Sequence, residues 1–247
     1  MVSLLSLCVV ACNPAQVKKD GEILIRNDVI ELSSSPRSLN IMVFGGTSGI
    51  GLETVKLAAQ RGHRVTSITR RPERMEFTHP RMKNLKGDIT KPETYSELIN
   101  DHDVFISTIG LSPTWKDVYV YSNGIIALLS EMKASDKTRL ITITGIGAGD
   151  SLGHGGFFYD WIIQPLLLKK DYEDKNRQEE ILQRSDLSWT IVRPGHLTDS
   201  KRKENYRVIR NIKGVVSGSI SRADVAHYLM HLSEEPTNIK EVILLTD

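Results

Sequence analysis

Three glycines after a short apolar run have a spacing suited to binding phosphate. Gly45, Gly49 and Gly51 follow residues 41–44 and directly precede a helical pattern. Glycine accepts a positive φ without a Cβ penalty, and a turn without side chains lets a pyrophosphate approach the backbone. The N–H groups and the dipole at the start of the helix attract that phosphate. The pattern G-x-x-x-G-x-G therefore predicts a dinucleotide site, with a purely structural turn as the alternative.

Two arginines stand at the end of the next apolar run, residues 65–68. Arg70 and Arg71 occupy the place where a site for NAD usually has Asp or Glu, which bind the ribose hydroxyls. A site for NADP uses Arg at this place, because the additional phosphate needs a cation. The position therefore favours NADP(H) over NAD(H), and the alternative is a basic turn on the protein surface.

Composition excludes several other classes of function. The chain has 247 residues, 40% of them hydrophobic, which suits one sizeable core, and its net charge of +2 and 6% aromatic content do not suggest nucleic-acid binding. Both cysteines, Cys8 and Cys12, lie near the start, so the body has no disulfide framework and no thiol nucleophile. His227 and His231 are one helical turn apart without a third ligand nearby, and we predict surface residues and no metal site.

Strand and helix patterns alternate from residue 40 onward, as in a parallel α/β sheet. We expect a single-domain Rossmann fold with a doubly wound, mostly parallel sheet. Glycines and aromatics within 150–168 predict a mobile segment over a pocket, with a buried helix at 161–168 as the alternative. Strands are predicted at 41–44, 65–68, 82–85, 103–110, 139–144, 189–193 and 241–245, and helices near 49–61, 91–100, 118–133, 171–184 and 221–232.

The first 38 residues are predicted to be a leader and linker, and residues 39–247 the nucleotide-binding domain. An apolar start, too short to span a bilayer, ends in Val9-Val10-Ala11-Cys12 and resembles a bacterial lipoprotein signal with Cys12 as the lipidated residue. No Lys or Arg precedes this run, and a nicotinamide cofactor favours the cytoplasm, so a plain leader is an equal alternative. Residues 22–26 are a candidate for a small edge strand.

Four segments together resemble the short-chain dehydrogenase/reductase superfamily. The nearest part is its atypical single-domain branch, which includes flavin reductases like biliverdin reductase B and NmrA-like NADP-binding regulators. The resemblance runs from Asn40 to the C-terminus. The segments are GGTSGIG at 45–51 with the trailing Arg70, Gly87-Asp88, SDLSWTIVRPGHLTD at 185–199, and ISRADVAHYL at 220–229.

This resemblance implies a role for each matching position. Lys175 is implied to bind the nicotinamide ribose, with an ordinary lysine on a helix surface as the alternative. The other implied contacts are Gly45, Thr47, Ser48, Gly49 and Ile50 for the pyrophosphate and nicotinamide side, Arg70 and Arg71 for the 2′-phosphate, Asp88 and Ile89 for the adenine, Thr108, Ile109 and Gly110 for the adenosine ribose and phosphates, and Pro194, Gly195 and His196 for the carboxamide.

The chain departs from the main branch of that superfamily in its acid–base residues. No Y-x-x-x-K motif occurs, because Tyr172 and Lys175 are separated by two residues and not three. Gly145 stands where the main branch often has Ser, with Thr144 just before it. The candidate proton donors are therefore Thr144, Tyr172 and His154, with Lys175 beside Tyr172 as a further catalytic candidate.

We expect an NADPH-dependent oxidoreductase that reduces a small flat acceptor such as a flavin, a quinone or a carbonyl compound. Hydride transfer to such an acceptor needs mainly proximity and orientation. The alternative is a non-catalytic NADP-binding redox sensor or assembly factor, because the fold does not determine the function. An epimerase or dehydratase is disfavoured, since too little chain follows residue 192 for a substrate domain. The partners expected are a small-molecule acceptor and no nucleic acid, with a membrane only if Cys12 is lipidated, in a monomer or small homo-oligomer.

Overall fold

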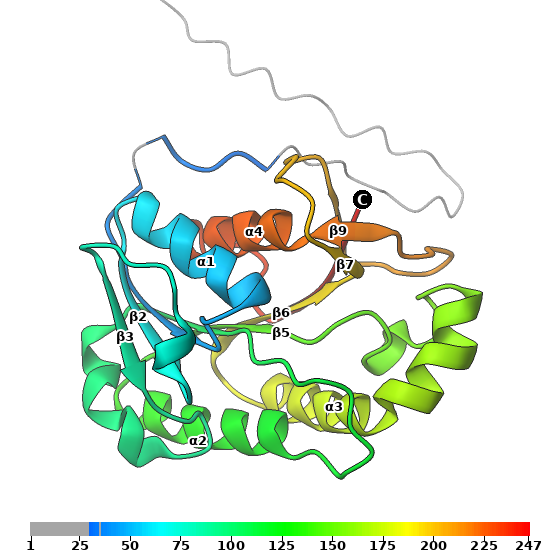
Figure 1. Ribbon diagram of the computed structural model, residues 1–247, viewed down its shortest axis with the longest axis horizontal. Helices are drawn as coiled ribbons and strands as arrows, with labels where there is room; N and C mark the ends of the chain where they lie inside the picture. The colour runs from blue at the N-terminus through cyan, green and yellow to red at the C-terminus, as the bar shows by residue number, and fades with distance from the viewer. Residues whose placement is uncertain (1–29, 35) are drawn as a thin grey trace, which may run out of the picture.

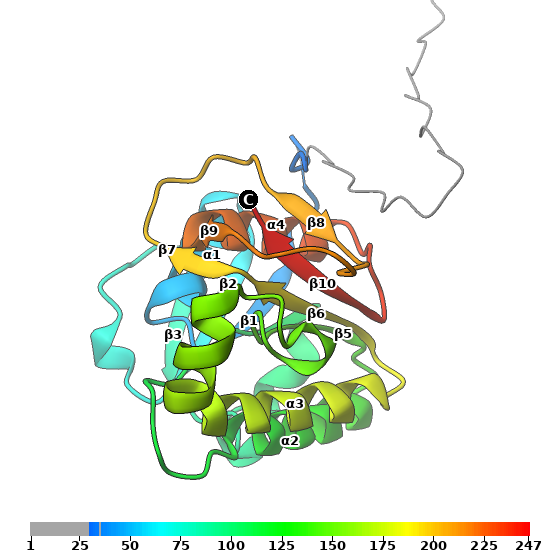
Figure 2. The ribbon, with the colours of Figure 1, turned by 90° about the vertical axis from the view of Figure 1, so that its right-hand side faces the viewer.

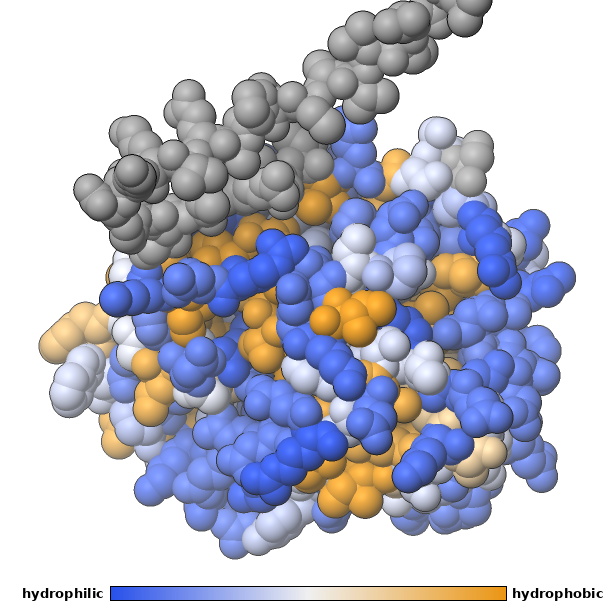
Figure 3. Space-filling view, turned by 180° about the vertical axis from the view of Figure 1, so that it is seen from behind, coloured by the Kyte–Doolittle hydropathy of each residue, from blue (hydrophilic) through white to orange (hydrophobic). Residues whose placement is uncertain are grey.

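The computed structural model describes residues 30–34 and 36–247. Both cysteines and the candidate edge strand at 22–26 lie outside the described residues, and the predicted domain boundary at residues 38 and 39 stays a prediction. Within the described part, no helix is long and apolar enough to cross a membrane. Seen from behind, the surface is mostly hydrophilic with apolar residues in small patches (Figure 3).

The described residues form three layers, with one large sheet between two pairs of helices (Figures 1 and 2). On one face of the sheet lie α1 (Gly49–Gln60) and α4 (Arg222–Glu234), which pack against each other. On the other face lie α2 (Val120–Ala134) and α3 (Lys169–Gln183). This arrangement confirms the predicted Rossmann-like α/β fold.

The main sheet has the strand order β3-β2-β1-β4-β5-β6-β10-β8. All neighbours pair in parallel except β8, which runs antiparallel to β10. The chain winds outward from β1 to β3 and then returns to β4, so the winding direction changes between β1 and β4 and leaves a crevice at their carboxyl ends. The strands are β1 (Asn40–Phe44), β2 (Arg64–Thr69), β3 (Met82–Lys86), β4 (Val104–Ser107), β5 (Arg139–Ile143), β6 (Ser188–Pro194), β8 (Arg207–Ile209) and β10 (Glu241–Thr246), and a separate parallel pair is formed by β7 (His196–Thr198) and β9 (Ser219–Ser221).

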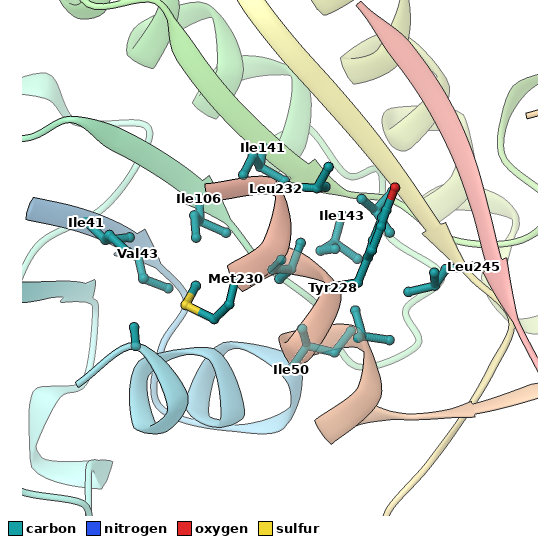
Figure 4. Close-up of a cluster of buried hydrophobic side chains, with 14 of the residues drawn as sticks. Ile41, Val43, Ile50, Ile106, Ile141, Ile143, Tyr228, Met230, Leu232 and Leu245 are labelled. Atoms are coloured by element: carbon teal, nitrogen blue, oxygen red, sulfur yellow. The ribbon is translucent and has the colours of Figure 1, made fainter. Parts of the chain in front are cut away.

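The central strand β1 supplies both hydrophobic cores. Because side chains alternate along a strand, Ile41 and Val43 point to the α1 and α4 side, where they join a cluster with Met230 of α4 (Figure 4). Met42 and Phe44 belong to a second cluster on the α2 and α3 side. All four side chains are buried, and each contributes about 1.5–3 kcal/mol to the burial free energy. An unbroken apolar run is what a strand covered on both faces requires.

The side chain of Ser221 caps the N-terminus of α4. The Ser221 hydroxyl oxygen accepts the N–H of Asp224 at 2.9 Å, and the same hydroxyl donates to the Asp224 carboxylate at 2.6 Å. The other carboxylate oxygen of Asp224 accepts the N–H groups of Lys203 and Glu204, both at 2.8 Å. The cap therefore also fixes the loop that follows β7.

The predicted helix at 91–100 is wrong, because the segment consists of two short 3₁₀ turns, Pro92–Thr94 and Ser96–Asp101. The Thr94 hydroxyl donates to the Lys91 carbonyl oxygen at 2.7 Å and accepts the Asp88 N–H at 3.1 Å. These local bonds compete with the hydrogen-bond ladder of a regular helix.

His227 is not a surface residue as predicted, since it is only 2% exposed. Its Nδ1 lies 2.7 Å from the Tyr206 hydroxyl oxygen, and burial lowers the pKa of His227 below its usual value. His231 is half-buried. Among the described residues, no group of three or more His, Cys, Asp or Glu could hold a metal ion. The two histidines are therefore packing residues of α4.

The segment before α3 is helical, but it is not the buried helix that the sequence left open. Residues Tyr159–Leu168 form a π-helix, continuous with α3, in which only Gln164 is buried. This helix projects beside the carboxyl edge of the sheet (Figure 2). The predicted mobility of the segment stays a prediction.

Candidate functional site

Two adjoining cavities follow the carboxyl edge of the sheet. The larger one has a volume of about 560 Å³ and lies beyond the ends of β1, β4, β5 and β6. The smaller one, of about 90 Å³, lies beyond β1, β2 and β3. Gly45 and Ile109 line both cavities, so the two form one continuous cleft across the point where the winding direction changes.

The structure brings nearly all of the predicted site residues to this cleft. His154 lines neither cavity. The larger cavity is lined by Gly45, Ser48, Gly49, Ile50, Thr108, Ile109, Gly110, Thr144, Tyr172, Lys175, Pro194, Gly195 and His196, and the smaller one by Thr47, Arg70, Arg71, Asp88 and Ile89. Their individual roles remain those predicted from the sequence.

The glycine turn has the backbone geometry of a phosphate cradle. Gly45 and Gly49 have φ values of +91° and +57°, a region that L side chains rarely adopt. A Cβ on Gly51 would overlap the carbonyl oxygen of Gly45 and the hydroxyl oxygen of Thr108. The Ser48 side chain does not cap α1, so the N–H groups of the first helical turn face the cleft uncapped. A pyrophosphate fits this turn.

The smaller cavity offers positive charge and one unsatisfied hydroxyl group. Arg70 and Arg71 are exposed, and neither pairs with a carboxylate of the described residues. The buried Thr69 hydroxyl oxygen has no hydrogen-bond partner within the described part of the chain. One oxygen of Asp88 accepts the N–H and the hydroxyl of Thr90, at 3.0 and 2.9 Å, which fixes that carboxylate at the rim. This end of the cleft therefore suits the adenosine part and a phosphate.

Lys175 is held inside the cleft rather than on the helix surface. Its Nζ lies 2.8 Å from a carboxylate oxygen of Asp171, and its side chain is 13% exposed. The ammonium also lies 4.7 Å from the ring centre of Tyr172 and 5.4 Å from that of Tyr121. The other oxygen of Asp171 accepts the Tyr121 hydroxyl at 2.6 Å, and that hydroxyl oxygen accepts the N–H of Leu111 at 3.1 Å. Asp171 thus orients both Lys175 and the loop that lines the cleft.

The Tyr172 hydroxyl is hydrogen-bonded inside the protein. It lies 2.8 Å from the Tyr159 hydroxyl, which donates to the carbonyl oxygen of Ile146 at 3.2 Å. Tyr172 therefore donates to Tyr159. Burial, followed by the neighbouring Tyr159, raises the pKa of Tyr172 far above its usual value. The geometry thus does not prepare Tyr172 to release a proton at neutral pH.

The Thr144 hydroxyl is also committed to a protein partner. It donates to a carboxylate oxygen of Glu179 at 2.7 Å. Arg193 donates to the two oxygens of the same carboxylate at 3.0 and 2.5 Å, and Arg193 also pairs with Asp150. This buried network beneath the cleft ties β5, β6 and α3 together.

His154 does not reach the cleft. Its Nδ1 donates to the carbonyl oxygen of Val215 at 2.7 Å, and its own carbonyl oxygen accepts the N–H of Ser217 at 2.8 Å. These two bonds join the loop after β5 to the turn before β9. His154 therefore has a structural contact outside the two cavities, and its role as a proton donor stays a prediction that this geometry does not favour.

Sequence reasoning missed several residues of the cleft, and Tyr159 and Arg222 are two with polar side chains. The Tyr159 ring meets the His196 ring edge to face, with centroids 4.9 Å apart. Arg222 pairs with Asp199 at 2.7 Å and lies next to Gly49. Tyr159 belongs to the aromatic cluster that the sequence placed over a pocket, and Arg222 belongs to the ISRADVAHYL segment. Those two signals could have pointed to them.

Comparison with known proteins agrees with this geometry. A family model described as NAD(P)H-binding matches residues 45–236. YwnB of Bacillus subtilis, an uncharacterized protein, is 28% identical over 220 residues, covering 82% of this chain and 96% of that protein. SSP1627 of Staphylococcus saprophyticus, described as an uncharacterized oxidoreductase, is 26% identical over 239 residues, covering 83% and 94%.

Solved structures share the same architecture. ChuY, an anaerobillin reductase from Escherichia coli O157:H7, superposes with a TM-score of 0.70 at 22% identity, covering 84% of this chain and 96% of that one. A short-chain dehydrogenase/reductase from Veillonella parvula in complex with NADP has a TM-score of 0.70 at 16% identity, covering 85% and 95%. These likenesses support the fold alone. Together with the family match, they confirm the Rossmann architecture.

Proposed function

Because the chain belongs to the NAD(P)H-binding family, we propose that it is an NADPH-dependent oxidoreductase that reduces a small flat acceptor. The observation that carries this proposal is the continuity of the cleft. Its two cavities share Gly45 and Ile109, with Arg70 and Arg71 at one end and Lys175 at the other. The two arginines, the glycine turn and Lys175 thus follow one another along the cleft in the order of the adenosine phosphate, the pyrophosphate and the nicotinamide ribose of an extended dinucleotide.

The preference for NADPH over NADH rests on the end of β2. The two arginines are exposed cations that are free of carboxylate partners among the described residues. An added phosphate gains charge-assisted hydrogen bonds from such groups, whereas a ribose hydroxyl gains little. The neighbouring Asp88 carboxylate lines the same cavity, with one oxygen bonded to Thr90, so Arg70 and Arg71 supply the positive charge at this corner.

The walls of the larger cavity suit a flat, mostly apolar acceptor. Tyr159, Ile163 and Leu197 line it, and His196 packs against the Tyr159 ring. Aromatic and aliphatic walls bind a planar ring through its faces, while few polar groups fix its orientation.

Placement is the main contribution of the protein in this proposal. A bound reduced nicotinamide supplies the hydride, and the acceptor takes up a proton from water. Tyr172 and Thr144 both donate their hydroxyl protons to protein partners, Tyr159 and Glu179. Lys175 and the glycine turn orient the bound molecules, and orientation alone lowers the barrier of a hydride transfer substantially.

Two relatives support a redox activity. SSP1627 is described as an uncharacterized oxidoreductase and ChuY as an anaerobillin reductase. One observation favours the alternative of a non-catalytic NADP-binding sensor. The Tyr172 hydroxyl has a raised pKa and a protein partner, so no activated tyrosine is available for acid catalysis.

The test is NADPH oxidation by the purified protein with a panel of flavins, quinones and aldehydes, next to calorimetry with NADPH and NADH. Turnover of any acceptor above the rate without protein supports the oxidoreductase. Tight NADPH binding without turnover of the whole panel selects the sensor. The proposal as a whole fails if neither nucleotide binds or protects the protein against thermal unfolding.

A further inference from the structure

Large apolar side chains protrude from one side of the molecule, next to the cleft but outside it. Phe157, Trp161 and Leu166 are 78%, 73% and 56% exposed, and Leu152, Phe158 and Val216 are exposed as well. We call these six residues the apolar face. They come from the loop after β5, the π-helix Tyr159–Leu168 and the turn before β9, on the side that faces the viewer in Figure 2.

The apolar face is a continuous feature of the fold rather than a scatter of side chains. Phe157, Trp161 and Leu166 are spaced by four and five residues, which brings them to one side of a helix with the wide turn of this segment. The Phe157 and Trp161 rings have centroids 6.4 Å apart. Val216 lies against Gly156, and the bonds of His154 to Val215 and Ser217 hold the two loops together.

Such exposure is unfavourable in water unless another surface covers it. The π-helix has one charged residue, Asp160, and its carboxylate accepts the N–H of Gly155 at 3.2 Å. The helix does not fold inward, because only Gln164 is buried. The side chains of the apolar face are therefore available to a partner.

We propose that the apolar face docks on the surface of a lipid bilayer that contains anionic lipids. Trp, Phe and Leu side chains on a short protruding helix are the groups that enter the boundary between headgroups and acyl chains. The exposed Lys169 directly follows the helix, and the exposed Lys213 precedes Val216 by three residues. Cations on both flanks match the negative charge of anionic headgroups.

A second copy of the chain fits these flanks less well. In a twofold pairing, the same patch meets itself, so the two sets of flanking lysines would approach each other. A bilayer imposes no such repulsion. The lipidation predicted at Cys12 is a separate argument for a membrane. A single lipid chain binds a membrane weakly, and a second signal makes the binding stable. If Cys12 carries lipid, the apolar face supplies such a second signal.

Docking would also orient the cleft. Tyr159 and Ile163 line the larger cavity and belong to the same helix as Trp161 and Leu166, so the mouth of the cavity lies beside the docked surface. An apolar acceptor dissolved in the bilayer would then reach the cavity without crossing bulk water. The docking itself does not depend on the proposed redox activity.

The test is co-flotation of the full-length chain with vesicles of phosphatidylcholine and phosphatidylglycerol, compared with phosphatidylcholine alone. The double variant Trp161→Ser/Leu166→Ser removes part of the apolar face without touching a residue of the cleft. Its matched control, Ile126→Ser/Ile239→Ser, removes two exposed apolar side chains from α2 and from the turn before β10. Thermal unfolding with and without NADPH verifies that each variant is folded.

We expect the wild type and the control to float with the anionic vesicles and the apolar-face variant to partition at least tenfold less. A charge variant, Lys169→Glu/Lys213→Glu, should lose the preference for phosphatidylglycerol while it keeps its stability. Equal flotation of the apolar-face variant and the control, or no flotation of the wild type, overturns the proposal. If the wild type is a dimer that does not bind vesicles, and the apolar-face variant is a monomer, the apolar face is the contact between two copies of the chain instead. Flotation and NADPH oxidation are separate measurements, so the failure of one does not obscure the other.

Discussion

The hydroxyl oxygens of Tyr172 and Tyr159 lie 2.8 Å apart on the wall of the cleft. The Tyr159 hydroxyl donates a hydrogen bond to the Ile146 carbonyl oxygen, so the hydroxyl hydrogen of Tyr172 points to Tyr159 and away from the acceptor space. Lys175 stacks on the face of the Tyr172 ring, 4.7 Å from its centre. The tyrosine and lysine of this cleft are thus neighbours, but their geometry is that of a packed pair rather than of an acid with its activator.

We predict that Tyr172→Phe lowers kcat/KM for NADPH oxidation by less than about threefold, since a true proton donor contributes ~10²–10⁴-fold. The pH profile of kcat/KM should stay unchanged, because the raised pKa of Tyr172 keeps its hydroxyl protonated throughout the neutral range. Steady-state kinetics measures both quantities. A loss of a hundredfold or more in Tyr172→Phe, with Tyr159→Phe unaffected, would show that Tyr172 is the donor after all.

Replacing Arg70 and Arg71 with Ala should weaken NADPH binding about 10–100-fold and NADH binding less than about threefold, because only NADPH has the phosphate that these cations face. Calorimetry with both nucleotides measures the two changes. Arg64→Ala is the matched control, since Arg64 is an exposed arginine at the opposite end of β2. Equal losses for NADPH and NADH would mean that the two arginines are ordinary surface charges.

Two variants of the Lys175 and Asp171 pair can distinguish a role of Lys175 in stability from a role in NADPH binding. Lys175→Met leaves the Asp171 carboxylate without its cation, and we expect the free energy of unfolding to fall by roughly 2–4 kcal/mol. The double variant Lys175→Met/Asp171→Asn should recover most of that stability, as coupled partners do. Both variants lack the Lys175 ammonium, so we expect both to bind NADPH more weakly than the wild type does. Recovery of affinity along with stability would show that Lys175 has no direct role toward the cofactor.

The glycine turn predicts a sharp difference between two alanine substitutions. Gly51→Ala places a Cβ against the backbone of Gly45, and neither the turn nor the helix end can yield without distorting the cradle. We expect a loss of about 1–3 kcal/mol in unfolding free energy and of NADPH binding. Gly110→Ala is the control for stability, because a Cβ at Gly110 meets no protein atom within 4 Å. Chemical denaturation and calorimetry report the two effects, and a Gly51→Ala variant that is as stable as Gly110→Ala and binds NADPH like the wild type would contradict the cradle.

His102 makes stability depend on pH at the amino end of the sheet, away from the cleft. Its Nδ1 donates to the Leu98 carbonyl oxygen at 2.7 Å, and its Nε2 accepts from the Thr66 hydroxyl at 2.9 Å. Burial lowers the pKa of His102 below its usual value of 6.5, although the bond to Leu98 acts in the opposite direction. The folded protein therefore favours the neutral ring, whereas the unfolded chain accepts a proton near pH 6.5.

We accordingly expect the free energy of unfolding to be highest above pH 6.5, and to fall as the pH drops below that value because the unfolded chain then binds a proton. His102→Asn keeps a donor for Leu98 and removes the titrating ring, so its stability should fall less steeply over the same range. The buried His227, whose pKa is also lowered, acts in the same direction and leaves a residual slope. Urea unfolding at several pH values measures the slopes. Identical slopes for wild type and His102→Asn would exclude this residue as the cause.

Most of the architecture was readable from local patterns. Residues 41–44 are apolar without interruption, so they indicated a strand covered on both faces, and β1 has that position. Ser221 and Asp224 have the spacing of a helix cap, and both make the expected bond. The site residues were predictable for the same reason, because turns at the carboxyl ends of parallel strands meet at one edge of the sheet.

Apart from the helix predicted at 91–100, the errors came from segments whose structure depends on neighbours distant in sequence. The three-residue strands β7, β8 and β9 are too short to show a period, and they exist because β8 pairs with β10 and because β7 and β9 pair with each other. His227 was placed on the surface, since a pattern on one helix does not reveal that Tyr206, 21 residues away, would cover it.

The sequence by itself determined the strand and helix order, the glycine turn and the placement of Arg70 and Arg71, because each depends on residues within a few positions of one another. Only the tertiary structure decided which polar groups of the cleft are free. The hydroxyl of Tyr172 is satisfied by Tyr159 and that of Thr144 by Glu179, which lies 35 residues away. It also decided that Trp161 faces solvent while Tyr159 faces the cleft. Both outcomes follow from contacts between segments that only the packed fold brings together.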